Sequence, residues 1–238
     1  MLEMLIMRQI YLDHAATTPL DGRVLKEMQL FFFEKFGNAG SLHFFGQEAR
    51  EAVEKAREGI AKAINAKPEE IIFTSGGTES DNIALQGVMH ANKGKGKGLV
   101  TSVFEHPAVL RTAEKLQKEG FEASYLPVTK QGFVELQEVK KFLKKETILA
   151  SVMHANNEIG TIQPIEEIGK LCREKGILFH SDAVQTVGKE RIDVKKMNID
   201  LLSASAHKFY GPKGIGFLYA RQGPRLSQSC TAEVMKMA

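Results

Sequence analysis

The stretch IIFTSGGTESDNIAL, residues 71–85, joins a short apolar run to a pair of glycines and then to a segment with helical apolar spacing. The run at 71–74 predicts a buried strand, because its apolar and partly β-branched residues are followed by a turn signal. The residues after Gly77 predict a helix, with Ser, Thr and Asp near its N-terminus. A strand, a glycine turn and a helix in this order are typical of an α/β fold.

The same alternation continues on both sides of this stretch. Apolar residues at 49, 52, 53, 56, 60, 63 and 64 form a helical stripe before it. Further helices are expected at 107–120, around 134–145 and at 164–176. The candidate strands lie at 71–74, 99–103, 122–128, 147–153, 177–181, 200–205 and 214–220. Because buried apolar strands alternate with helices, the sequence predicts an α/β fold with a mostly parallel seven-stranded sheet and helices on both faces.

The bulk composition is that of an ordinary globular protein. The chain has 238 residues, of which 43% are hydrophobic and 26% are charged, and its net charge is +3. This length suits one large domain. The KGKGKG run at 93–98 alternates with glycine and lacks aromatic neighbours, so we expect a solvated loop and no nucleic-acid partner. Glu3 and Arg8 interrupt the apolar N-terminus, so we expect no signal peptide, no membrane span and a cytoplasmic location.

The two cysteines, Cys172 and Cys230, do not belong to any Cys/His cluster. We therefore expect neither a metal site nor a disulfide framework. Cys172 shares the apolar side of the helix expected at 164–176 with Ile165, Ile168 and Leu171. A buried, unreactive thiol is expected there.

The residues that follow each strand are the candidate functional groups, because ligands of open α/β sheets bind beyond the carboxyl ends of the strands. The SGGT turn at 75–78 is neither a P-loop nor a GxGxxG motif. It can present backbone N–H groups and a helix N-terminus to a phosphate, or it can be a plain capped turn. The other strand ends carry Glu105, His106, His154, Asn156, Asn157, Asp182, Gln185, Ser205, His207 and Lys208.

Each of these groups has an ordinary explanation when it is taken alone. Asp182 can cap the next turn, and Asn156 and Asn157 can be turn residues. Taken together, they match the needs of pyridoxal 5'-phosphate (PLP), which binds an amine through its aldehyde, an acid through its pyridinium nitrogen and donors through its phosphate. Lys208 lies between a strand and the Gly/Pro-rich turn FYGPKGIG (209–216), and we expect it to be the amine. Burial and nearby cations are expected to lower the pKa of Lys208.

Longer stretches of the sequence resemble the cysteine desulfurases of the NifS/IscS type, within the class-V, fold-type-I aminotransferases. The resemblance covers about residues 10–221 and implies a PLP-dependent transferase fold of type I. The matching stretches are "IYLDHAATTP" (10–19), "FGNAGSLHFFGQEAR" (36–50), "IIFTSGGTESDNIAL" (71–85), "EHPAV" (105–109), "HANNEIGTIQPI" (154–165), "FHSDAVQTVGK" (179–189) and "SASAHKFYGPKGIGFLYAR" (203–221).

The resemblance implies a role for each matching site residue. Lys208 resembles the lysine that binds the cofactor as a Schiff base, and Asp182 resembles the partner of the pyridine nitrogen. His106 resembles the residue that stacks on the ring and handles protons. The remaining implied contacts are Asn157 and Gln185 near the phenolic oxygen and Gly77, Thr78, Ser205 and His207 around the phosphate.

The activity that the resemblance implies is the conversion of L-cysteine to L-alanine, with the sulfur passed on for iron–sulfur cluster or thiolation pathways. The implied partners are a second copy of the chain in a homodimer or a complementing C-terminal chain, together with a sulfur acceptor or an iron–sulfur scaffold. Family members are longer, and their second half supplies the nucleophilic cysteine, an arginine for the substrate carboxylate and a hydroxyl for the neighbouring subunit's phosphate. Cys230 does not lie in the family's cysteine motif.

On this basis the chain divides into an N-terminal arm (1–20), a PLP-binding large α/β domain (21–221) and a divergent tail (222–238). The family's small C-terminal domain is expected to be missing or incomplete. Two other functions stay open. One is a selenocysteine lyase or another class-V aminotransferase. Measuring sulfur release from cysteine and selenium release from selenocysteine would distinguish these from a cysteine desulfurase. The other is a non-catalytic PLP-binding fragment that acts with a partner chain.

Overall fold

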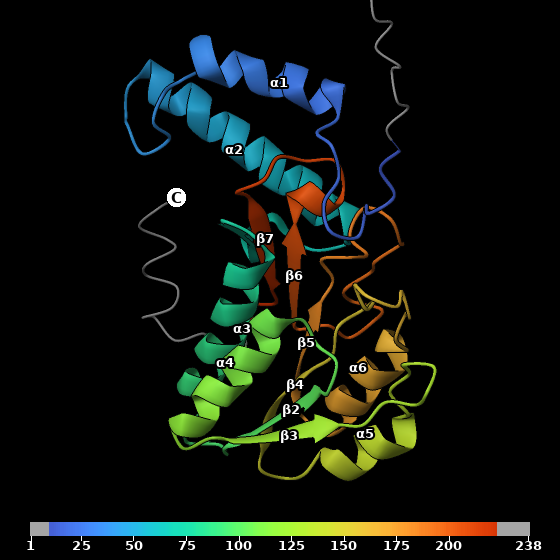
Figure 1. Ribbon diagram of the computed structural model, residues 1–238. Helices are drawn as coiled ribbons and strands as arrows, with labels where there is room; N and C mark the ends of the chain where they lie inside the picture. The colour runs from blue at the N-terminus through green and yellow to red at the C-terminus, as the bar shows by residue number, and fades with distance from the viewer. Residues whose placement is uncertain (1–9, 223–238) are drawn as a thin grey trace, which may run out of the picture.

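The computed structural model describes residues 10–222, and its centre is a seven-stranded sheet in the order β1-β7-β6-β5-β4-β2-β3 (Figure 1). The strands are β1 (Ile71–Thr74), β2 (Gly98–Ser102), β3 (Glu122–Leu126), β4 (Thr147–Ser151), β5 (Leu178–Asp182), β6 (Leu201–Ser205) and β7 (Gly216–Ala220). Strand β7 runs antiparallel to its neighbours β1 and β6, and all other neighbouring pairs are parallel. The predicted mostly parallel seven-stranded sheet is confirmed.

Helices cover both faces of the sheet, with α3 and α4 on one face and α5 and α6 on the other (Figure 1). The helices are α1 (Gly22–Phe33), α2 (Phe44–Ala63), α3 (Gly77–Ala91), α4 (Pro107–Lys118), α5 (Leu136–Phe142) and α6 (Ile165–Glu174), with short 3₁₀ turns η1 (Pro68–Glu70) and η2 (Ala206–Lys208). Within residues 10–222, no helix combines the length and apolarity needed to cross a membrane.

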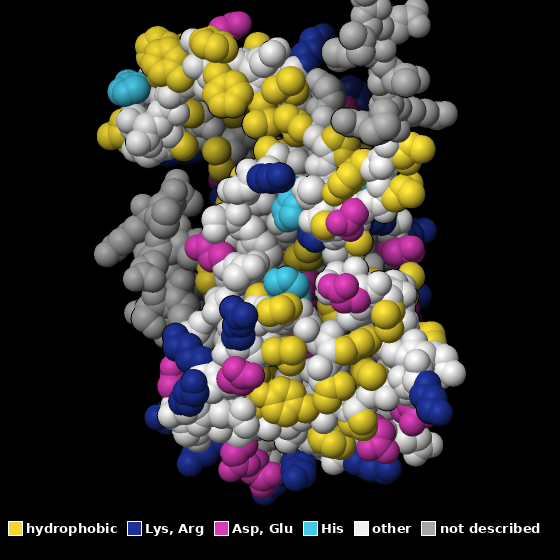
Figure 2. Space-filling model, in the orientation of Figure 1, with side chains coloured by type: hydrophobic (Ala, Val, Ile, Leu, Met, Phe, Trp, Pro, Cys, Tyr) yellow, Lys and Arg dark blue, Asp and Glu magenta, His cyan; other side chains and the backbone are white. Residues whose placement is uncertain are grey.

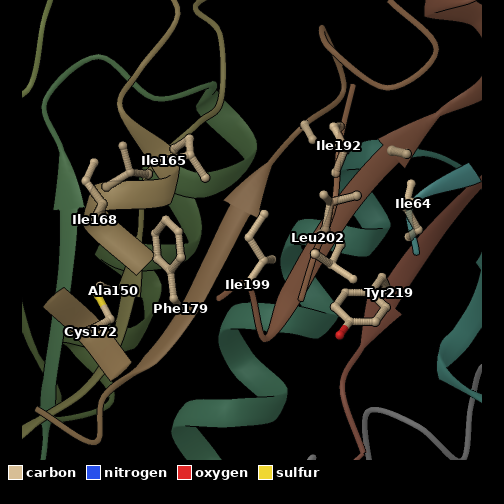
Figure 3. Packing of buried hydrophobic residues seen from close by; sticks show 14 of the residues in the cluster. Ile64, Ala150, Ile165, Ile168, Cys172, Phe179, Ile192, Ile199, Leu202 and Tyr219 are labelled. Carbon is tan, nitrogen blue, oxygen red and sulfur yellow. The ribbon is translucent and has the colours of Figure 1, made fainter. Parts of the chain in front are cut away.

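Alternate residues of the central strands pack into two separate core layers. Leu149 of β4 packs with α3 and α4, whereas the next residue, Ala150, packs with α5 and α6. This follows from the two-residue period of a strand that is buried on both faces. Figure 3 shows the second layer, with Cys172 of α6 close to Ala150 and Phe179. Cys172 is fully buried, so the expected burial is confirmed, and burial raises the pKa of its thiol to about 12, which favours low reactivity.

The strands change from apolar to polar toward their carboxyl ends on the α3 side of the sheet. Leu178 and Leu201 contribute to the apolar layer under α3 and α4. His180 and Ser203 lie two residues further along the same strands and are fully buried polar groups. Because β1, β2, β4, β5 and β6 all end at one edge, the sheet gathers polar groups beneath that edge.

Two helices differ from the sequence predictions. The sequence analysis missed α1, which Asp21 caps by accepting a 2.7 Å hydrogen bond from the Arg23 N–H. The α1 sequence has apolar residues at helical spacing (Val24, Met28 and Phe31), but none of the α1 residues is buried within the described structure. Helix α5 is shorter than the expected 134–145, and Val134 lies instead in an antiparallel β-bridge with Val128, its N–H donating to the Gln163 side chain at 2.9 Å.

Helix α1 carries an exposed apolar surface. Phe32 and Phe33 are 59% and 81% exposed, and Figure 2 shows hydrophobic side chains gathered over this part of the molecule. A groove of about 740 Å³ runs between α1, α2 and the edge of the sheet, and Phe31, Phe36 and Phe73 line it. Exposed apolar patches of this kind mark surfaces that another part or copy of a protein covers.

Candidate active site

A cavity of about 770 Å³ opens at the edge of the sheet where β1, β2, β4, β5 and β6 end. All the residues to which the resemblance assigns a role line it: Gly77, Thr78, His106, Asn157, Asp182, Gln185, Ser205, His207 and Lys208. The other strand-end candidates, Glu105, His154 and Asn156, do not line it. They come from five different strand ends, and the parallel arrangement of the strands brings them together. The individual role of each residue stays a prediction.

Lys208 follows β6 within the 3₁₀ turn η2 and extends its amine into this cavity. Its Nζ donates hydrogen bonds to the carbonyl oxygens of Ala15 at 2.5 Å and Ala16 at 2.9 Å. Burial and the positive charge of Lys189 lower the pKa of Lys208. A lowered pKa raises the fraction of uncharged amine, which is the form that attacks a carbonyl group.

The segment around Thr17 and Thr18 forms a wall of the cavity and is held against the residues next to Lys208. The Thr18 N–H and hydroxyl donate to the His207 carbonyl oxygen at 2.8 and 2.9 Å. The Thr17 hydroxyl lies 3.0 Å from His207 Nδ1. These contacts hold His207 in place, and burial together with Lys208 and Lys213 lowers its pKa.

Asp182 is the last residue of β5 and is 5% exposed. Its Oδ1 accepts a 2.9 Å hydrogen bond from the Val184 N–H, so the carboxylate does cap the following turn. The cap engages one oxygen and leaves the second oxygen for a ligand, so the two explanations offered by the sequence are compatible. Burial raises the pKa of Asp182, although the hydrogen bond from the Val184 N–H and the positive charge of Lys208 act against the rise.

A buried polar network lies behind Asp182, and the sequence analysis did not predict it. The His180 ring nitrogens lie 2.8 Å from the Ser151 hydroxyl and 3.0 Å from the Ser203 hydroxyl. Asp81 of α3 lines the cavity and places Oδ1 3.6 Å from His180 Nε2. Burial lowers the pKa of His180 to about 3, so the imidazole is neutral, and it raises the pKa of Asp81. His180 could have been predicted from its position two residues before Asp182, because side chains two residues apart lie on the same side of a strand.

The N-terminus of α3 meets the cavity at Gly77. A Cβ atom at this position would lie 2.5 Å from Val184 Cγ2 and 3.6 Å from Ser205 Cβ, so only glycine allows this approach. The first N–H groups of a helix have no partner within the helix and favour a bound anion. The hydroxyls of Thr78 and Ser205 line the same corner of the cavity. This corner suits a phosphate.

His106 and the two amides complete the lining. His106 is the N-cap of α4, and its Nδ1 accepts a 3.1 Å hydrogen bond from the Ala108 N–H, so the ring proton resides on Nε2. Asn157 donates to the Glu158 carboxylate at 2.7 Å, and Gln185 donates to the Ala15 carbonyl at 2.8 Å. The cavity therefore combines an amine, a buried acid, a flat imidazole and an anion corner, which correspond to the functional groups of PLP.

Comparison with known proteins agrees with this chemistry. A cysteine desulfurase IscS from Dictyoglomus turgidum is 58% identical over 92% of this chain, and one from Clostridium botulinum is 56% identical over 92%. The chain covers 56% and 55% of these two relatives, which is about half of their length. The resemblance to cysteine desulfurases seen in the sequence is confirmed.

Solved structures match the fold as well. A NifS-like protein superposes with a TM-score of 0.90 at 44% identity, covering 92% of this chain and 61% of its own. A structure described as SspA in complex with cysteine has a TM-score of 0.88 at 42% identity, covering 90% of this chain and 62% of its own. The aminotransferase class-V model matches residues 10–229, which include every strand of the sheet and every predicted site residue. On this match, together with the pocket at the strand ends, the chain belongs to the aminotransferase class-V family.

Proposed function

We propose that this chain is the cofactor-binding part of a PLP-dependent cysteine desulfurase, which takes the sulfur of L-cysteine and leaves L-alanine. The observation that carries the proposal is the single cavity that Lys208, Asp182 and the N-terminus of α3 share. Class-V aminotransferases are PLP-dependent. The curated relatives named above are cysteine desulfurases, and one structural neighbour is described with bound cysteine.

The cavity fits the cofactor on two structural observations. Gly77 lets the N-terminus of α3 pack directly against Val184 and Ser205, so that its first N–H groups reach the cavity beside the Thr78 and Ser205 hydroxyls, as a phosphate corner requires. Asp182 is buried with one oxygen committed to the Val184 N–H, which leaves the other for a ring nitrogen. Gly77, Thr78, Ser205 and His207 would hold the phosphate, Asp182 the nitrogen, Asn157 and Gln185 the phenolic oxygen, and Lys208 the aldehyde.

Each protein group then has a defined task. When bound, PLP supplies an electron-accepting ring that stabilises negative charge at the substrate's α-carbon. Lys208 binds the cofactor through its amine, and Asp182 keeps the pyridine nitrogen protonated, which strengthens that acceptor. His106 holds a proton on Nε2 at the cavity wall, where it can exchange a proton with the substrate.

The sulfur acceptor is proposed to be a thiol other than Cys172. A nucleophilic thiol must be accessible and ionised, but Cys172 is fully buried and has a pKa of about 12. Cys230 lies outside the described residues. The acceptor thiol, and a route to iron–sulfur cluster or thiolation pathways, would then come from a complementing C-terminal chain or from a partner protein. The location is proposed to be cytoplasmic.

The proposal also includes association, as a homodimer or with a complementing chain. It is supported by the exposed phenylalanines of α1 and by the apolar groove beside them. A partner that covered this surface would remove apolar area from water.

The test uses the purified chain and added PLP. We expect visible absorbance, and we expect borohydride reduction followed by peptide mapping to place the cofactor on Lys208. Lys208→Ala should abolish the adduct. Lys213→Ala is the matched control, because Lys213 lines the same cavity and should be dispensable for the adduct. An adduct on Lys213, or one spread over surface lysines, would overturn the assignment.

The second arm measures sulfide from L-cysteine and selenide from selenocysteine. We expect slow sulfide release by the isolated chain, because the thiol within residues 10–222 is inaccessible. Adding the C-terminal half of a desulfurase relative should accelerate it. Selenide release without sulfide release would favour a selenocysteine lyase instead.

A further inference from the structure

Glu105 lies between two loops that contribute to the cavity but does not line the cavity itself. It precedes His106 in the turn between β2 and α4. Its Oε1 accepts a 3.0 Å hydrogen bond from the Met153 N–H, at the start of the loop that follows β4. The same oxygen accepts the Ser102 hydroxyl proton. One carboxyl oxygen thus joins the loop of His106 to the loop of Met153 and Asn157.

The surroundings of Glu105 are those of a buried structural group. The residue is 4% exposed, and its Oε2 has no hydrogen-bond partner among the described residues. Burial, with a smaller contribution from Asp182, raises the pKa of Glu105 to about 8, although the bonds from Ser102 and Met153 act against the rise. The side chain is therefore mostly neutral at pH 7, and glutamine has almost the same shape and charge.

A second contact runs between the same loops. The Asn156 side-chain amide donates to the Phe104 carbonyl oxygen at 2.9 Å, and Asn156 Oδ1 accepts the N–H groups of Glu158 and Ile159. Asn156 thereby fixes the shape of its own loop and its distance from Phe104. Glu105 adds a contact closer to the cavity, because its partner Met153 lines the cavity wall.

We propose that Glu105 is a positioning residue that sets the separation between His106 and Asn157, and with it the placement of the group proposed for the ring face relative to the group proposed for the phenolic oxygen. This inference rests on the proposed function. His106 and Asn157 come from different loops, so their spacing depends on contacts between those loops. Glu105 makes that contact through buried hydrogen bonds, which resist displacement more than exposed ones because water cannot replace them.

The test compares Glu105→Ala with Glu105→Gln. Alanine removes the acceptor of both hydrogen bonds, whereas the glutamine carbonyl oxygen can accept them at the same place. Glu105→Ala should raise the PLP dissociation constant about tenfold and change the visible circular dichroism of the bound cofactor. Glu105→Gln should stay within about twofold of the parent and keep its spectrum.

Glu70→Ala is the matched control. Glu70 is 6% exposed and accepts backbone N–H groups from Lys67 and Gln222 at 2.9 and 3.1 Å, but it does not line the cavity. Its loss should lower stability and leave cofactor affinity and dichroism unchanged. If Glu105→Ala behaved like Glu70→Ala, or if Glu105→Gln were as impaired as Glu105→Ala, the positioning role would be overturned.

A cofactor-free measurement separates this inference from the proposed function. Hydrogen exchange of the apo chain should rise in both 103–106 and 152–157 for Glu105→Ala, and it should be normal for Glu105→Gln. Unchanged exchange in either loop would also overturn the inference. Failure of the parent chain to bind PLP through Lys208 would instead refute the proposed function, whatever the exchange data showed.

Discussion

Gly77→Ala probes the contact that brings the N-terminus of α3 to the cavity. The added Cβ would lie 2.5 Å from Val184 Cγ2, whereas carbon atoms at optimal separation are about 3.5–4.0 Å apart. The two carbon atoms must therefore move apart by about 1 Å. The Val184 side chain is short and restricted at χ1, so rotation of this side chain does not provide that separation. The helix N-terminus or the turn after β5 must move instead.

The size of the effect follows from this overlap. Overpacking by one methyl group in a close-packed site costs about 1–3 kcal/mol. Because the strained contact lies in the phosphate corner, we expect most of the displacement to fall on α3, with PLP affinity reduced about tenfold or more. Val184→Ala removes the colliding methyl group, so the double variant Gly77→Ala/Val184→Ala should recover affinity, with a coupling of about 0.5–3 kcal/mol.

Gly59→Ala is the control, because a Cβ at Gly59 in α2 would meet no atom within 4 Å. It should stabilise the chain by about 0.5–1 kcal/mol through helix propensity. Urea unfolding gives the stabilities, and absorbance titration gives the PLP dissociation constants. If Gly77→Ala matched Gly59→Ala in both measurements, or if Val184→Ala gave no rescue, α3 would not be held at the cavity by this contact.

Three other perturbations test neighbouring groups. His180 has a folded-state pKa of about 3 against 6.5 in the unfolded chain, so the unfolded state binds more protons as pH falls below 6.5. As the pH falls from 6.5 toward 3, the free energy of unfolding of the parent should therefore decrease by up to about 1.4 kcal/mol per pH unit relative to that of His180→Asn. If the urea midpoints of the two proteins changed in parallel at all pH values, this expectation would be contradicted. Asp182→Asn keeps an acceptor for the Val184 N–H, so its melting temperature should stay near that of the parent. Exchange of the α-proton of bound cysteine should slow about a hundredfold or more in that variant, and undiminished exchange would refute the role of Asp182. Cys172 should react with iodoacetamide only in urea, as peptide mapping would reveal, because its thiol is buried and has a pKa of about 12.

The architecture and the positions of the cavity residues could be predicted from the sequence. Each strand is a short apolar run, and parallel strands deliver their carboxyl ends to one edge, so Asp182 and Lys208 had to lie near each other once the strands were recognised. The glycine pair at 76–77 indicated a close approach of backbone to an anion, and the structure adds the neighbour, Val184, that makes glycine necessary. Helix α1 was missed although its apolar residues Val24, Met28 and Phe31 have helical spacing, and within the described residues it buries none of them.

The long-range hydrogen bonds that position the cavity residues were determined only by the tertiary structure. Lys208 donates to Ala15 across 193 residues of chain, and the Met153 N–H donates to Glu105 across 48. No periodicity or local motif records such pairings, because they depend on which loops the sheet order places side by side. The same holds for the closeness of Asp81 and His180, which belong to α3 and β5. Local sequence determines which segments become strands and helices, whereas the pKa values and hydrogen bonds of the cavity arise from burial, and burial exists only after those segments have packed.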